Sequence, residues 1–111
     1  MSDTMQVSSE LYGITPPLPR KVDTILLGGA GAESYTVPAG TRWVIINANG
    51  GVWYRVGAVA NAPVGDVTDG TGSAYLGAGQ AKQARVEEGV AISFIRDGAA
   101  AVNVVIERFS N

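Results

Sequence analysis

The chain has 111 residues, a formal net charge of −2, and neither histidine nor cysteine. That length corresponds to a single domain, and the missing cysteine excludes disulfides, thiolate chemistry and cysteine-ligated zinc. Charged residues make up only 16% of the chain and Arg20-Lys21 is the sole adjacent basic pair, so no basic stripe is available to neutralise nucleic-acid phosphates.

We therefore expect no nucleic-acid partner, and no contact with a membrane. No apolar run approaches the ~20 residues that span a bilayer. The first residues also lack the basic and apolar regions of a signal peptide.

Residues 1–21 differ in composition from the rest of the chain. Three prolines in the segment 14–20 cannot donate ladder hydrogen bonds, which is typical of a polyproline-type conformation and not of a central strand. One interpretation is a frayed terminus. The other is an extended N-terminal arm across a neighbouring subunit, because a solvated tail seldom carries so many apolar side chains. The apolar contacts of such an arm would be Leu11, Tyr12, Ile14 and Leu18.

Residues 22–111 are predicted to form the folded domain. Its short runs rich in valine and isoleucine are separated by glycine, proline and asparagine turns, as in an antiparallel sheet protein. Residues 58–62 could extend a strand or form an edge, and residues 63–73 are predicted to form a long loop that 74–76 holds in place. The expected strands are 22–27, 33–37, 41–47, 52–56, 83–87, 90–96 and 102–109.

Two turn signals predict tight hairpins in this domain. Asn49-Gly50 lies between the third and fourth expected strands, and Asp97-Gly98 lies between the last two. Both dipeptides favour the positive φ angles that two-residue hairpin turns require. In the run 41–47, apolar side chains lie at both odd and even positions, so both faces of the expected strand are apolar. This pattern predicts a central strand covered on both faces.

Strand-sized runs at this spacing predict an all-β fold, an antiparallel β-sandwich of jelly-roll-like type with an extended N-terminal arm. No helical period of useful length competes with this interpretation.

The loop 63–73 contains the best carboxylate pair, Asp66 and Asp69. Such a pair could serve a glycosidase or contribute to a Ca²⁺ site. Turn chemistry explains both residues more simply, since aspartate stabilises turns and Asp69 precedes a glycine. Without histidine, a serine nucleophile would also lack its usual base. We therefore expect no enzymatic activity, no cofactor and no metal.

Trp53 and Tyr75 are the aromatic residues most relevant to binding. Together with Trp43 and Tyr54 they could form a platform on which a sugar stacks. A tryptophan in the middle of a strand is more often part of a core or a subunit contact, and that is the interpretation we adopt.

Several stretches of strand and turn residues carry a family resemblance that covers residues 33–109. They are Tyr35-Thr36-Val37-Pro38-Ala39-Gly40-Thr41-Arg42-Trp43, Val52-Trp53-Tyr54-Arg55-Val56-Gly57, residues 62–70, and residues 90–95 with 102–105. This pattern resembles that of small virion proteins of tailed bacteriophages, of the capsid decoration (cement) type.

The resemblance implies a non-enzymatic structural role. Such proteins are β-sandwich or jelly-roll subunits on the outer capsid surface, where arms and loops bridge neighbouring major capsid proteins. It implies a virion location after assembly in the host cytoplasm, and a homo-oligomer. We favour a trimer over a dimer because shells offer threefold sites. The expected contacts are the four arm residues with Trp53, Asp66, Asp69 and Tyr75.

Two other functions remain open on the sequence. One is an accessory role at the head–tail junction or on the tail. The other is a carbohydrate-binding β-sandwich module built around the tryptophans.

Overall fold

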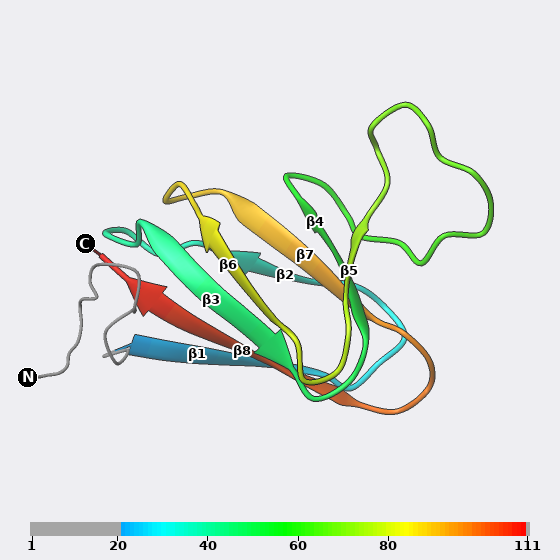
Figure 1. Ribbon diagram of the computed structural model, residues 1–111, viewed down its shortest axis with the longest axis horizontal. Helices are drawn as coiled ribbons and strands as arrows, with labels where there is room; N and C mark the ends of the chain where they lie inside the picture. Colours follow the sequence, from blue (N-terminus) through cyan, green and yellow to red (C-terminus); the bar gives the residue numbers. More distant parts are fainter. Residues whose placement is uncertain (1–20, 111) are drawn as a thin grey trace, which may run out of the picture.

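The computed structural model describes residues 21–110, so the arm residues Leu11, Tyr12, Ile14 and Leu18 lie outside the described part. The described residues form eight β-strands and no helix (Figure 1). The strands are β1 (Lys21–Leu27), β2 (Glu33–Thr36), β3 (Trp43–Ala48), β4 (Val52–Val56), β5 (Ala74–Leu76), β6 (Ala81–Arg85), β7 (Ala91–Arg96) and β8 (Val102–Phe109).

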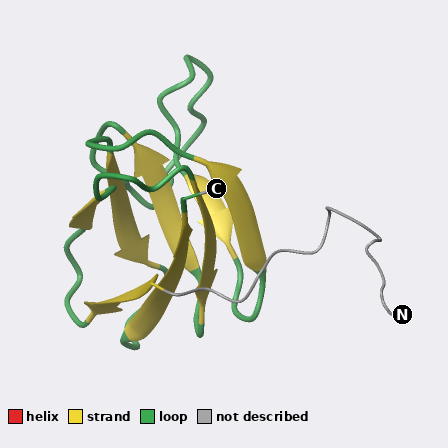
Figure 2. Ribbon diagram, turned by 90° about the vertical axis from the view of Figure 1, so that its left-hand side faces the viewer, coloured by secondary structure: helices red, strands yellow, loops and turns green. Residues whose placement is uncertain are grey.

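The strands form two four-stranded antiparallel sheets, with the orders β1-β8-β3-β6 and β2-β7-β4-β5. The sheets lie in two layers that face each other (Figure 2). Strand β1 pairs with β8, β2 with β7, β3 with β6 and β4 with β5. This nesting is that of one long antiparallel hairpin rolled into two layers, which defines a jelly roll. The predicted all-β sandwich of jelly-roll type is therefore confirmed for residues 21–110.

The two predicted hairpins are wrong, although both turns exist. Strands β3 and β4 belong to different sheets, and so do β7 and β8. After β3, the Asn49 amide donates to the Asn103 carbonyl at 3.2 Å, and the Asn103 amide donates to Asn49 Oδ1 at 2.9 Å. Asn49 is therefore hydrogen-bonded to Asn103 of β8 at the point where the chain leaves this sheet and crosses to the other. Gly98 has a φ of +100°, but its turn also joins strands across the sandwich.

The core lies between the two sheets and follows the predicted alternation. In β8, Val102, Val104 and Ile106 are buried and point inward. In β7, Ile92 and Phe94 are buried in the same cluster, and Phe94 has no exposed surface. Alternate residues of a strand point to opposite faces, so each strand contributes one apolar row to this core.

Strand β3 corrects the expectation of cover on both faces. It lies inside its sheet between β8 and β6, but only its inward residues, such as Val44 and Ile46, are buried. Its outward residues are half-buried, and Trp43 stacks on Phe109 with ring centroids 4.0 Å apart. An antiparallel sheet with one layer against it leaves its other face toward solvent.

Two further expectations need adjustment. Residues 58–62 form no strand, because β4 ends at Val56 and Gly57 follows with a φ of +82°. The strand expected at 83–87 lies at Ala81–Arg85.

Phe94→Ala should lower the free energy of unfolding by about 3–5 kcal/mol, because truncation of a fully buried phenylalanine leaves a cavity in the core. Urea unfolding followed by far-UV circular dichroism measures this change. The matched control is Val64→Ala, whose side chain is fully solvent-exposed and whose effect should be within about 0.5 kcal/mol. Equal effects of the two changes would contradict the described core.

Candidate interaction site

One lateral edge of the sandwich, between β1 and β2, is closed by polar contacts. The hydroxyl of Tyr35 on β2 donates to Asp23 Oδ2 on β1. Asp23 also forms an ion pair with Arg108 Nε at 2.8 Å. We call these three residues the Tyr35 clasp. Burial of the phenol raises the pKa of Tyr35, and the hydrogen bond to Asp23 raises it further because that bond needs the proton. The clasp joins the two sheets and has a structural role.

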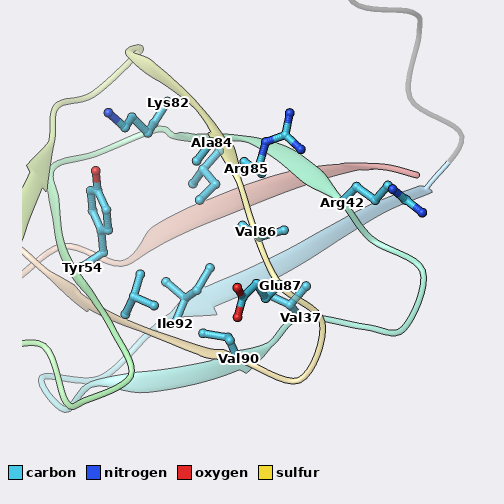
Figure 3. A pocket seen from close by; sticks show the side chains of 12 residues that line it. Val37, Arg42, Tyr54, Lys82, Ala84, Arg85, Val86, Glu87, Val90 and Ile92 are labelled. Atoms are coloured by element: carbon cyan, nitrogen blue, oxygen red, sulfur yellow. The ribbon is translucent and has the colours of Figure 1, made fainter. Parts of the chain in front are cut away.

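The opposite edge, between β5 and β6, is open. Strand β5 has only three residues and pairs with β4 only from Val52 to Tyr54. Among residues 21–110, no strand therefore lies beside the end of β4 at this edge, and a groove of about 520 Å³ lies between the sheets (Figure 3). We call it the open groove. It is lined by Val37, Arg42, Ile46, Tyr54, Val56, Lys82, Ala84, Arg85, Val86, Glu87, Val90 and Ile92.

The open groove is apolar inside and mainly cationic at its rim. Val37, Ile46 and Ile92 belong to the buried core. Val56 continues the inward row of β4, yet 59% of its surface is exposed, which is unusual for an inward-facing valine. The charged lining residues are Arg42, Lys82, Arg85 and Glu87. This chemistry suits an apolar occupant that carries negative charge.

Sequence reasoning missed this groove. The sequence indicates the groove only weakly. The expected strand 83–87 did not include Lys82, and no local pattern shows that β5 is too short to cover β4. Lys82 lies at an inward position of the edge strand β6, which indicates an open edge. That position can be recognised only when the register of the strand is known.

The loop of residues 57–73 projects beyond the sandwich between β4 and β5 (Figure 1). Its base is anchored, since the Ala60 amide donates to the buried Ser93 Oγ at 3.0 Å and the Asn61 amide donates to Ser73 Oγ at 3.1 Å. Residues 61–72 between these anchors are all exposed. The loop walls enclose a hollow of about 670 Å³ that Arg55 also lines. The predicted long loop is thus present and is held at its base.

Within this loop, Asp69 is used by the turn itself. Its Oδ1 accepts hydrogen bonds from the Thr71 hydroxyl at 2.6 Å and from the Thr71 amide at 3.1 Å. These bonds lower the pKa of Asp69, the hydroxyl bond most, because both favour the ionised carboxylate. Gly70 follows with a φ of +88°, as an aspartate-glycine turn requires. Asp66 lies in the same exposed loop and lines its hollow.

In the structure, Asp69 therefore stabilises a turn, and Asp66 is exposed to solvent. Among residues 21–110, no three histidine, cysteine, aspartate or glutamate side chains gather in a group that could hold a metal ion.

The structure does bring Trp53 and Tyr75 together. They are register partners of β4 and β5, with ring centroids 4.7 Å apart and planes inclined at 52°. The Tyr75 hydroxyl donates to Asp97 Oδ2 at 3.3 Å. It also lies over Gly51, so a side chain at that position would displace the Tyr75 ring from this arrangement. Because the rings are tilted, the pair offers no shared plane for a sugar.

Trp53 and Tyr75 still form a small exposed patch on the outer face of their sheet. Tyr75 is 49% exposed, and the buried Nε1 of Trp53 has no hydrogen-bond partner among the described residues. An aromatic patch with polar tips is typical of protein contacts.

Comparison of the chain with protein-family models, with curated proteins and with solved structures gives no match. Within residues 21–110, no helix of the length and apolarity needed to cross a membrane is found.

The Tyr35 clasp predicts a specific alkaline loss of stability. The pKa of Tyr35 is raised in the folded state, so the unfolded chain loses this proton first as the pH rises above about 10. The free energy of unfolding should therefore be insensitive to this group below that pH and fall above it. Tyr35→Phe should fall less steeply between pH 9 and 11 in urea unfolding, because its titrating group is absent. Identical slopes for both proteins would contradict the clasp.

Proposed function

We propose that this chain is a non-enzymatic structural protein of a tailed-phage virion, which decorates the capsid and stabilises it by bridging major capsid proteins. The observation that carries this proposal is the long exposed loop of residues 57–73, anchored at its base on a jelly-roll sandwich. The stretches that carry the family resemblance include strand β4, which precedes the loop, and residues 62–70 of the loop itself.

The loop suits a binding role because it exposes apolar side chains. Val64 has its whole side chain in solvent, and Val67 is 51% exposed. Loops on a rigid scaffold are frequent binding elements, because the scaffold positions them without needing their residues in the core. Burial of such valines against a partner would contribute favourable apolar contact.

The mechanism needs contact area and a stiff frame. A subunit that binds only the assembled shell stabilises that shell by mass action, since disassembly must first release it. A specific interface of about 1,600 Å² in total is within reach of a domain of this size. Copies joined as a trimer on the outer capsid surface would add their contacts through effective concentration.

The direct test mixes the purified full chain with expanded heads that lack this protein and then sediments the heads. Co-sedimentation that saturates at a fixed number of copies per head supports the proposal. Absence of the chain from the head pellet argues against capsid binding. Immuno-electron microscopy of complete particles separates the head surface from the alternative location at the neck or tail.

The exposed loop predicts a variant that folds normally but binds heads weakly. Val64→Asp should reduce affinity for expanded heads by about tenfold, because it places a charge in an apolar contact that would be desolvated. The matched control is Ala99→Asp, which places the same charge in an exposed turn between β7 and β8. Co-sedimentation titrations measure both. Equal affinity of the two variants for expanded heads would show that the loop is not part of the contact.

A further inference from the structure

The open groove exists because the inward row of side chains on β5 is too short. Leu76 is the first residue of that row and is buried, and Ala74, which pairs with Tyr54, is the second. The next alternate position is Gly72, which has no side chain and lies outside the strand. Alternate residues of each strand fill the space between the sheets of a sandwich, so one row of apolar side chains is missing beside Val56.

The walls of this gap are apolar and partly open to solvent. Val56 is 59% exposed, and Val86 and Val90 opposite and beside it are half-buried. Packed sheets lie about 10 Å apart, which leaves room for one layer of side chains between them. The volume of about 520 Å³ is within the range of small-molecule sites. The gap therefore suits one unbranched acyl chain in the place of the missing row.

One end of the groove carries two free polar groups. Figure 3 shows Lys82 and Tyr54 toward this end, on β6 and β4 respectively. Among residues 21–110, no carboxylate forms an ion pair with Lys82, and no hydrogen bond engages the Tyr54 hydroxyl. An ammonium and a hydroxyl can both donate to a carboxylate. This end is therefore equipped for the head group of an anionic amphiphile.

The charge of the whole rim supports an anionic ligand. Arg42, Arg85 and Glu87 lie toward the other end, so the lining has three cationic side chains and one anionic side chain. The chain as a whole has a net charge of −2, so this positive rim is a local feature and not a consequence of composition. Potentials of opposite sign favour the encounter of ligand and site and exclude ligands of like charge.

Lys82 also argues against the addition of a peptide strand at this edge. It pairs with Ile46, whose side chain is buried, so Lys82 projects from the inward face of β6. A charged residue in that position on an edge strand is a recognised obstacle to further strand pairing. An acyl chain needs no backbone edge, and it leaves the lysine ammonium in water beside the head group.

We propose that the open groove binds a free, single-chain fatty acid as its carboxylate. The acyl chain lies over Val56, Val86 and Val90, and the carboxylate lies between the Lys82 ammonium and the Tyr54 hydroxyl. The four steps from Lys82 to Val86 span about 13 Å, which a chain of medium length covers. The site is separate from the exposed loop, so this inference does not depend on the virion role.

The first test measures binding of sodium dodecanoate to the full chain by isothermal titration calorimetry, below the micellar concentration. Circular dichroism verifies that the chain stays folded. Dodecanoate should bind saturably, and hexanoate more weakly, because each buried methylene strengthens binding about fourfold. Dodecyltrimethylammonium has the same chain with the opposite charge and should bind at least about threefold less tightly. Equal affinities for the two dodecyl compounds, or no saturable binding of dodecanoate, would overturn the proposal.

Two matched pairs of variants locate the site. Lys82→Gln should weaken dodecanoate binding about threefold, whereas Lys21→Gln, at an exposed position on β1, should leave it unchanged. Val56→Asp should weaken it about tenfold or more, because a second carboxylate would lie beside the acyl chain. Its control is Val59→Asp, at an exposed position that does not line the groove.

Unchanged affinity in both groove variants would overturn the proposal. A peptide that alternates valine and aspartate provides a further arm of the same titration. Binding of this peptide without binding of dodecanoate would assign the groove to strand addition and would also overturn the proposal.

Discussion

The fold depends on the contact between the inward faces of its two sheets. Phe94 of one sheet and Val44, Val104 and Ile106 of the other are fully or almost fully buried in a single cluster. Within the described part of the chain, neither sheet has another layer to cover these side chains, so each sheet is stabilised by its partner. The jelly-roll order reinforces this dependence, because every connection except that from β4 to β5 crosses between the sheets.

One lateral edge of the sandwich is closed by side-chain contacts, and the opposite edge is open. At the β1–β2 edge, the Tyr35 clasp links the sheets through a hydrogen bond and an ion pair. At the β5–β6 edge, the short β5 does not extend along the end of β4, so among residues 21–110 that end pairs only with β7, and the apolar interior reaches the surface. Because of this asymmetry, the open groove, the outer edge of β6 and the base of the exposed loop after β4 lie at one side of the sandwich.

The sequence predicted the features that depend on local alternation and failed on those that depend on pairing partners. The inward row of Val102, Val104 and Ile106 follows directly from period two, and the structure has it. Asn49-Gly50 indicated a turn correctly, but the partner of Asn49 is Asn103, far along the chain, and no local pattern reports that pairing.

In the candidate site too, the sequence predicted the features set by neighbouring residues and missed those set by strand pairing. The role of Asp69 in its turn followed from the adjacent glycine, and its bonds to Thr71 confirm it. The meeting of Trp53 with Tyr75 depends on the register of β4 with β5, which the sequence did not specify. The open groove depends on where β5 ends, so only the three-dimensional pairing reveals it.

In the proposed role, this sandwich is a rigid part between larger neighbours, with its exposed loop as a contact. The most direct measurement is a cryo-electron microscopy reconstruction of the complete particle. The proposed role predicts an eight-stranded sandwich on the outer capsid surface, with residues 57–73 against the major capsid protein. A capsid surface without this density, on particles that contain the chain, would contradict it.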